Sequence, residues 1–255
     1  HCIYFLLLNT FQRIILQIKS VIVAAKRTPI GSFQGQLSSL TASDLASHLI
    51  INIMRDLDIP ADAVDEVILG NVLSAGQGQS PARQAAIKGG LPNTVETLTI
   101  NKMCGSGLKA IMLADQAIKS NSADIIIAGG MESMSNAPHI LQNFRTGNKL
   151  GHSKVIDSVI HDGLWDVYTN QHMGNCAEML VKDRHYSRED QDAYAVSSYR
   201  KANSAKKANI FKEEIIPIEV KIKNEKMLIS DDEEPSRVDY DKISKLKPAF
   251  VQNGT

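Results

Sequence analysis

The sequence predicts an α/β protein: a mixed, mostly parallel sheet with helices on both faces, followed by a second, irregular α+β unit. Short apolar runs alternate with helix-like stretches in residues 21–133. The runs are continuously apolar, as in parallel sheets that are covered on both faces. In residues 134–255 the chain becomes richer in His, Asn, Lys and Glu. The length of 255 residues accommodates one or two such units.

The elements of the first unit follow from the apolar patterns. The predicted strands are 21–25, 64–73, 94–100 and 123–130, and the predicted helices are 41–57, 80–88 and 106–120. In helix 41–57 an apolar residue recurs every four positions from Leu45 to Leu57, which predicts one buried stripe. Thr41 or Ser43 is a suitable N-cap for this helix, and Ser80 for the next.

The second unit contains two predicted helices, 174–186 and 187–209. Ser187 and Asp190 form a capping-box pattern at the start of the second one. Residues 213–222 are expected to form a strand, and the polar residues 224–242 a surface excursion.

The composition argues against several classes of function. Lys plus Arg and Asp plus Glu number 28 each, so the charge balance does not favour nucleic acid. The cysteines Cys2, Cys104 and Cys176 form no CxxC pair, and there is no HExxH, so we expect no metal site. A reducing, cytoplasmic setting is expected because the cysteines form no disulfide framework.

Residues 1–20 differ in composition from the rest of the chain. Polar side chains interrupt their apolar run well before the ~20 residues that a membrane span needs, and no basic region precedes it as in a signal peptide. We therefore expect no membrane association and interpret these residues as a leader or a fragment end. Because no predicted helix or strand is completed before Thr255, we expect an incomplete reading frame.

Cys104 lies in the turn of "INKMCGSGLKAIM", at the carboxyl end of a predicted strand, where open α/β sheets bind ligands. A thiol attacks as the thiolate, which the positive end of a helix stabilises, and Gly105 and Gly107 let backbone donors approach a bound carbonyl. The helix that follows is apolar nearly all round, which predicts burial and a rigid mount. Free cysteines are also often simply packed, so the residues alone leave both roles open.

Seven segments carry a resemblance that covers residues 21–255. They are "VIVAAKRTPIGSFQG", "AGQGQSPARQAA", "NKMCGSGLKA", "IIAGGMESMSNAPH", "DGLWDVYTNQHMGNCAEML", "SREDQDAYAVSSYRKA" and "KLKPAF". In this order and spacing they closely resemble the thiolase family. The resemblance implies an N-terminal α/β domain at 21–133, a truncated CoA-binding loop domain at 134–255, and an absent C-terminal half.

The resemblance also implies a chemistry, that of an acyltransferase which forms or cleaves acetoacetyl-CoA. Cys104 would take an acyl group from an acyl-CoA as a thioester, and the carbanion of a second acetyl-CoA would attack it. No metal or redox cofactor is implied, because coenzyme A is part of the substrate. The implied partners are acyl-CoA molecules and other copies of the chain, in a dimer or tetramer.

Five further residues match the family's substrate-binding positions. His172 precedes Met-Gly, as in acetoacetyl-type members, where it lies near the thioester oxygen, and Met173 would line the same pocket. Leu164 and Phe250 match positions that touch the pantetheine arm of CoA. Arg237 aligns loosely with an arginine near the adenine end. A structural or packing role is the alternative for each.

Several family motifs, namely N-A-S-G, N-E-A-F, G-H-P and C-x-G, do not occur in these residues. The resemblance assigns activation of the nucleophile to the G-H-P histidine and the α-proton to the C-x-G cysteine. We therefore expect this polypeptide alone to be inactive and to expose an apolar face.

The residues leave three other interpretations open. The alternatives are a non-catalytic CoA-binding or assembly protein, a longer-chain 3-ketoacyl-CoA thiolase of β-oxidation, and a redox-sensing cysteine protein. His172 argues against the longer-chain enzyme. Nothing marks Cys176 as a resolving cysteine for Cys104, which argues against redox sensing, and we expect Cys176 to be structural.

Overall fold

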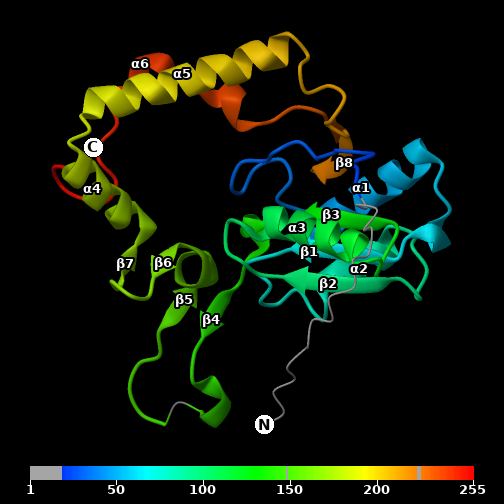
Figure 1. Ribbon diagram of the computed structural model, residues 1–255. Coiled ribbons are helices and arrows are strands. Elements are labelled where there is room, and N and C mark those ends of the chain that lie inside the picture. The colour runs from blue at the N-terminus through cyan, green and yellow to red at the C-terminus, as the bar shows by residue number, and fades with distance from the viewer. Residues whose placement is uncertain (1–18, 148, 223–224) are drawn as a thin grey trace, which may run out of the picture.

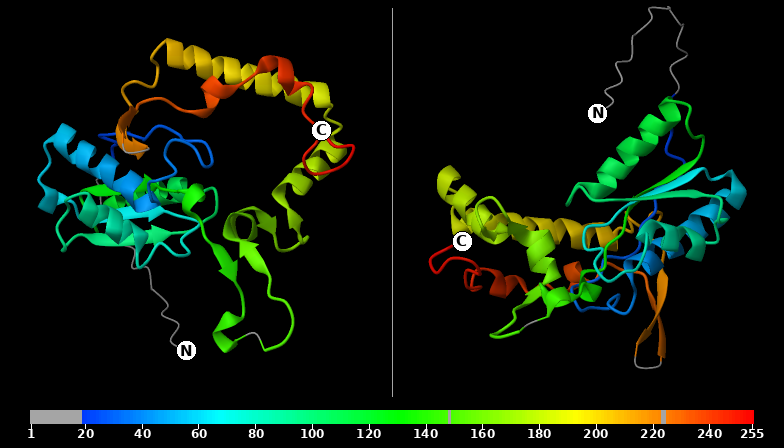
Figure 2. Two further views of the ribbon diagram at one scale, coloured as in Figure 1. Left: turned by 180° about the vertical axis from the view of Figure 1, so that it is seen from behind. Right: turned by 90° about the horizontal axis from the view of Figure 1, so that it is seen from below.

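The computed structural model describes residues 19–147, 149–222 and 225–255. The predicted leader, residues 1–20, lies outside the described residues except for its last two. An α/β unit occupies one side of the molecule, and the following residues run out from it and return in an open arc (Figure 1). Figure 2 shows the same arc from behind and from below.

The α/β unit is built on three parallel strands in the order β2-β1-β3. The strands are β1 (Glu66–Gly70), β2 (Glu96–Ile100) and β3 (Ile126–Gly130). Gly70 at the end of β1 lies opposite Ile100 of β2 and Gly130 of β3, so the three strands end at one edge. Helix α2 (Pro81–Lys88) makes the crossover from β1 to β2, and α3 (Ser106–Lys119) makes the crossover from β2 to β3. The predicted parallel sheet is confirmed.

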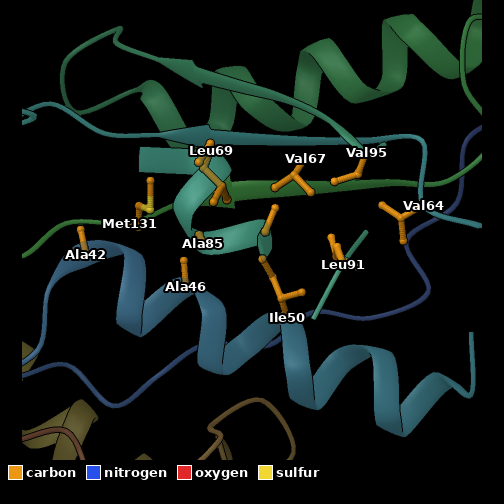
Figure 3. Packing of buried hydrophobic residues seen from close by; sticks show 12 residues of the cluster. Ala42, Ala46, Ile50, Val64, Val67, Leu69, Ala85, Leu91, Val95 and Met131 are labelled. Atoms are coloured by element: carbon orange, nitrogen blue, oxygen red, sulfur yellow. The ribbon is translucent and has the colours of Figure 1, made fainter. Parts of the chain in front are cut away.

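The helices cover both faces of this sheet, as predicted (Figure 3). Helix α3 lies on one face, α2 lies on the other, and α1 (Ala42–Leu57) packs on the far side of α2. The core between them includes Val67 and Leu69 of β1 and Ala85 of α2, all buried. Alanines at the contacts let the helices approach closely, and the buried apolar side chains stabilise the unit.

Helix α1 begins as predicted but buries another face. Thr41 and Asp44 form a capping box, in which each side chain accepts a hydrogen bond from the other residue's backbone N–H. The apolar residues that face the core are not those of the predicted stripe but Ala42, Ala46 and Ile50. The predicted stripe from Leu45 to Leu57 is only half-buried, because α1 packs against α2 rather than directly on the sheet.

Two local predictions in this unit fail in part or in full. Ser80 occupies the N-cap position of α2 as predicted, but it has a left-handed φ of 45° and its side chain caps nothing. Instead, Thr99 Oγ1 accepts the hydrogen bond from the Ala82 N–H at 3.0 Å. Residues 21–25 form no strand, and Val21 and Val23 are exposed. Within the described ranges no strand pairs with these residues, and an apolar run needs a partner for its backbone N–H and C=O groups.

Helix α3 is buried on one face only, so the expected burial on all sides is wrong. Ser106, Ala110 and Ala114 are its buried residues, on the face towards β1 and β3. The opposite side carries Leu108, which is 67% exposed, and the exposed Ile111. The apolar face that we expect this polypeptide to expose is therefore present on α3 within the described residues.

The second unit consists of short antiparallel pairs and two longer helices. The strand pairs are β4 (His139–Leu141) with β5 (Val155–Asp157), β6 (Trp165–Asp166) with β7 (Gln171–His172), and β8 (Ile218–Ile222) with β9 (Glu225–Ile229). The helices are α4 (Met173–Arg184), α5 (Arg188–Lys207) and the short α6 (Tyr240–Ile243). The part of the chain that the structure describes also contains the single-turn helices η1 (Ala61–Ala63), η2 (Met134–Asn136), η3 (Phe144–Thr146), the π-helix η4 (Val159–Leu164) and η5 (Glu234–Arg237).

Two predicted helices and one predicted strand of this unit are confirmed as α4, α5 and β8. The predicted capping box of Ser187 and Asp190 is present at the start of α5. Strand β9 lies inside the predicted polar surface excursion. Its first four residues are exposed as expected, but the pattern does not predict the strand itself, nor that Ile229 turns inward to join a small cluster with Leu37 and Val220. In the described ranges, each helix is too short or too polar to cross a bilayer.

Arg27 connects an early segment of the chain to a late one. Its guanidinium donates to both carboxylate oxygens of Asp232, at 2.7 and 3.0 Å. Next to this pair, the Glu233 carboxylate accepts hydrogen bonds from the backbone N–H groups of Ser32 and Gln36, each at 3.0 Å. Charge-assisted bonds of this kind are stronger than neutral ones, so they hold residues 27–36 against the returning arc.

Burial alone would raise the pKa of Asp232, but the hydrogen bonds from Arg27 and from the Ile30 N–H lower it below its ordinary value. A lowered pKa in the folded state means that this stabilisation is present above the ordinary pKa of about 4 and is lost as the pH falls below it. We therefore expect Asp232→Asn to reduce the free energy of unfolding at pH 7 by about 1–2 kcal/mol. Urea unfolding should show the difference from wild type shrinking towards a pH of about 3.

The matched control is Asp183→Asn, because Asp183 pairs with its neighbour Arg184 in an exposed position. This change should alter the stability by less than about 0.5 kcal/mol at either pH. An Asp232→Asn effect that is the same at both pH values would contradict the assignment.

Candidate active site

Cys104 lies in a tight turn between β2 and α3, at the edge where the three parallel strands end. The Met103 N–H donates to Asn101 Oδ1 at 2.9 Å. Ser106 Oγ accepts from the Lys102 N–H at 2.8 Å and donates to the Met103 carbonyl at 2.6 Å. These bonds hold Met103 at a φ of 50°, a left-handed conformation that residues with a Cβ rarely adopt. The backbone next to Cys104 is therefore strained and held by its surroundings.

The first turn of α3 lies directly on the ends of β1 and β3. A Cβ at Gly70 would lie 2.5 Å from Ser106 Cβ and 2.8 Å from Gly107 N, so a side chain does not fit there. Gly130 also faces Gly107, and a Cβ on it would lie 3.4 Å from the Gly107 Cα. The sheet edge thus fixes where α3 starts and, with it, the position of Cys104.

The thiol of Cys104 is exposed, so the alternative of a packed, buried cysteine is wrong. Cys104 precedes Gly105, the N-cap of the 14-residue helix α3. It lies at the positive end of the helix dipole, where the first backbone N–H groups have no acceptor within the helix. An accessible sulfur in such a place can react with an electrophile, and the N–H groups can bind an oxygen that becomes negatively charged.

His172 and Phe250 lie together at the start of α4. Their rings stack with centroids 4.9 Å apart and an interplanar angle of 24°. Gly174 makes this possible, because a Cβ there would collide with the Phe250 ring. The Gly174 N–H donates to His172 Nδ1 at 2.9 Å. A neutral His172 that accepts at Nδ1 carries its proton on Nε2, which can then donate to a ligand.

Leu164 and Met173 flank this pair. Leu164 ends η4 and precedes Trp165, whose backbone pairs with that of His172 across the β6–β7 ladder. Met173 follows His172 as the first residue of α4. Both side chains are exposed. The structure thus gathers four of the predicted binding residues in one place, and their contacts with CoA stay a prediction.

Arg237 lies outside this group. It ends η5 and forms ion pairs with Glu233 at 3.5 Å and with Glu234 at 3.8 Å. Glu233 in turn binds the loop that contains Ser32. The structure therefore places Arg237 beside the connection between the two units, and its role near the adenine end of CoA stays a prediction.

The loop after β1 links the Cys104 turn to the group around His172. The Val72 carbonyl accepts a long hydrogen bond from Asn101 Nδ2, at 3.5 Å. The Leu73 side chain packs against Gly163, where a Cβ would lie 3.5 Å from Leu73 Cδ2. Gly163 belongs to η4, next to Leu164. One short loop thus touches both sides of the site.

Glu132 is the residue at this edge that the sequence analysis missed. Its carboxylate accepts hydrogen bonds from the backbone N–H groups of Val72, at 2.8 Å, and Leu73, at 3.2 Å. Burial raises the pKa of Glu132, although these two hydrogen bonds act in the opposite direction. A carboxylate that follows an apolar strand and two glycines, as in "IIAGGMES", is the sequence signal that could have found it.

Comparisons with known proteins agree with this geometry. The family described as Thiolase, N-terminal domain, matches residues 20–255. A probable acetyl-CoA acetyltransferase of Escherichia coli (strain K12) is 50% identical over 236 residues, which are 92% of this chain and 60% of that protein. An acetyl-CoA acetyltransferase of Yarrowia lipolytica is 47% identical over 234 residues, 92% of this chain and 58% of that protein.

A solved structure has the same fold over most of the chain. The crystal structure of Acat5 thiolase from Ascaris suum in complex with coenzyme A matches with a TM-score of 0.83 and 41% sequence identity. The match covers 90% of this chain and 58% of that one.

An α/β sheet that presents an exposed thiol at the start of a helix defines the class of site. The chain belongs to the thiolase family, whose N-terminal domain it matches over residues 20–255. It spans 60% and 58% of the length of the two curated relatives described above.

The contact at Gly70 leads to a test of how the sheet edge supports the site. We expect Gly70→Ala to push α3 away from the sheet, to cost about 1–3 kcal/mol of stability and to slow alkylation of Cys104 by iodoacetamide. Urea unfolding and the alkylation rate are the measurements. Gly129→Ala is the matched control, because nothing lies within 4 Å of a Cβ at Gly129. Equal effects of the two changes on alkylation would argue against the packing constraint.

Proposed function

We propose that the protein is an acetyl-CoA acetyltransferase that forms or cleaves acetoacetyl-CoA through an acyl thioester on Cys104. The observation that carries this proposal is the exposed Cys104 thiol at the positive end of α3, held at the ligand-binding edge of the sheet. The names of the relatives support the same reaction class.

In the first half-reaction the Cys104 thiolate attacks the thioester carbonyl of an acyl-CoA. The bond between that carbonyl carbon and the CoA sulfur breaks, CoA leaves as its thiolate, and the acyl group stays on Cys104. Backbone N–H groups at the start of α3 stabilise the oxygen that carries negative charge during the attack.

In the second half-reaction an acetyl-CoA loses an α-proton, and its carbanion attacks the acyl-Cys104 carbonyl. A new carbon–carbon bond forms, the bond to the Cys104 sulfur breaks, and the thiolate is regenerated. The family motifs to which the resemblance assigns these proton transfers do not occur in the 255 residues. We therefore propose that this polypeptide, tested alone, turns over acetoacetyl-CoA slowly or not at all.

His172 donates from Nε2 to the thioester oxygen of the substrate in this proposal. The supporting observation is the Gly174 N–H bond to Nδ1, which leaves Nε2 as the protonated nitrogen of a neutral ring. Stacked Phe250 fixes the plane of that ring, while Met173 and Leu164 line the acyl and pantetheine region. Arg237 approaches the adenine end of CoA.

A comparison of the two described cysteines tests the nucleophile. In the complete protein, Cys104→Ser should abolish the gain of one acetyl group in the intact mass after incubation with acetyl-CoA, because a serine hydroxyl is not activated by this site. Cys176→Ser should still be acetylated, since Cys176 lies within α4. Acetylation of the Cys104→Ser variant would contradict the proposed mechanism.

A second pair of variants tests the proposed hydrogen bond to the substrate. His172→Ala should lower kcat/KM for acetoacetyl-CoA by about 10²-fold, as expected when one preorganised donor is lost. His161→Ala should leave it nearly unchanged, because His161 is exposed and its ring makes one long hydrogen bond, to Gln142 Nε2 at 3.5 Å, within the described residues. The assay is thiolysis of acetoacetyl-CoA by the complete protein, and a His172→Ala enzyme with unchanged kcat/KM would exclude this role.

A further inference from the structure

We propose that Glu132 is a positioning residue for acyl transfer at Cys104. Its carboxylate holds the loop after β1 in place between the turn that carries Cys104 and the segment that carries Leu164 and His172. This inference rests on the proposed function.

The Glu132 carboxylate closes the loop of β1 onto the end of β3. Besides the N–H groups of Val72 and Leu73, it accepts a hydrogen bond from Asn71 Nδ2 at 2.8 Å. Asn71 Nδ2 also donates to the Met131 carbonyl, at 3.2 Å. Three donors on one carboxylate fix both its own position and the course of residues 71–73. No lysine or arginine in the described part of the chain shares this carboxylate, so its partners are those three donors.

Asn71 gives a second indication that the hydrogen bonds around Glu132 hold the loop in a single conformation. The residue is 3% exposed, and its Oδ1 has no hydrogen-bond partner among the described residues. A buried acceptor without a donor costs free energy. The two hydrogen bonds that Asn71 Nδ2 donates, to Glu132 and to the Met131 carbonyl, fix the orientation of the amide. In this orientation Oδ1 is left without a donor among the described residues.

From this loop one path of contacts leads to Cys104. The Asn71 N–H donates to the Ile100 carbonyl at 2.9 Å, which binds the loop to the end of β2. Asn101 then bridges the Val72 carbonyl, at 3.5 Å, and the Met103 N–H, at 2.9 Å. Because Met103 is the strained residue immediately before Cys104, a shift of the loop would alter the position of the sulfur.

A second path leads to the substrate-binding side. The Leu73 side chain is buried and packs against Gly163 of η4. The next residue is Leu164, and Trp165 then pairs with His172 in the β6–β7 ladder. Glu132 therefore sets the spacing between the nucleophile and the predicted acyl-binding residues, and catalysis is sensitive to this spacing.

The chain offers a matched control at the opposite end of the same strands. The Asp65 carboxylate accepts hydrogen bonds from the N–H groups of Asp124, at 2.7 Å, and Ile125, at 2.9 Å. Like Glu132, Asp65 joins β1 to β3 through backbone donors, but it lies before β1 begins. Removing either carboxylate loosens the sheet, and only Glu132 lies at the edge that carries Cys104.

The experiment compares Glu132→Ala, Glu132→Gln and Asp65→Ala in the complete protein. The rate of Cys104 acetylation is measured against acetyl-CoA concentration, together with stability in urea. Glu132→Ala should lower the maximal acetylation rate by about tenfold or more, because the sulfur is misplaced. The half-saturating concentration should stay within about twofold of wild type.

Glu132→Gln should recover most of the lost rate, because the amide keeps an acceptor for the Val72 N–H and can donate to a reoriented Asn71. Asp65→Ala should change the rate by less than about twofold, as expected for a change at the far end of the sheet. Equal losses in Glu132→Ala and Asp65→Ala would overturn the inference and leave Glu132 a purely structural residue.

Two further measurements test the positioning role of Glu132 even if the Glu132→Ala variant does not fold or the proposed function is wrong. If Glu132→Ala does not fold, Asn101→Ala is the alternative, because it removes the side chain that links the loop to Met103 and lies at an exposed position. Asn101→Ala should show the same loss of maximal acetylation rate, and an unchanged rate would overturn the inference. If wild-type Cys104 is not acetylated, the proposed function fails. Alkylation of Cys104 by iodoacetamide then decides the positioning role, and equal rates in Glu132→Ala and Asp65→Ala would overturn it.

Discussion

The arrangement of the site depends on how closely the first turn of α3 approaches the ends of β1 and β3. Gly70 has no room for a side chain beside Ser106, and Gly107 packs against Gly130. Because the helix start is fixed against the sheet, the residues between β2 and α3 must turn within a very short distance. This tight turn requires Met103 to adopt a left-handed backbone conformation. The sulfur of Cys104 is left exposed in front of the helix rather than packed beneath it.

Two kinds of architecture meet at this edge. The parallel sheet presents Cys104, the proposed nucleophile, on a strand–helix turn. The antiparallel β6–β7 ladder presents His172, whose Nδ1 accepts a hydrogen bond from a backbone N–H. Residues 72 and 73 lie between them and are held by the Glu132 carboxylate. Burial disfavours the ionised form of this carboxylate and so raises its pKa. The backbone donors that it binds offset part of that cost.

The sequence patterns predicted the features that neighbouring residues determine. They failed where the structure of a segment depends on another segment that packs or pairs with it. The crossovers, the N-cap at Thr41, the capping box at Ser187 and the place of Cys104 after a strand all follow from short-range periodicity and cap chemistry. Residues 21–25 have the composition of a strand but no ladder partner in the described structure. The apolar residues of α3 could not reveal which of its faces is covered.

The missed parts of the site have a similar explanation. Glu132 is distant in sequence from the loop that it holds, so periodicity does not reveal the pair. The stacking of His172 on Phe250 also joins residues far apart along the chain, and only the absence of a side chain at Gly174 allows it. The resemblance named both residues, but the contact between them required the fold.

The hydrogen bonds that join Arg27 and Ser32 to Asp232 and Glu233 span 205 and 201 positions of the chain. Contacts so distant form late, because the loop that they close is long and costs entropy. At a synthesis rate of about 5–20 residues per second, residues 27–36 leave the ribosome roughly 10–40 seconds before the carboxylates that bind them. The early segment therefore waits without its acceptors while the sheet assembles. Its capture therefore follows the synthesis of the three strands and of the helices between them.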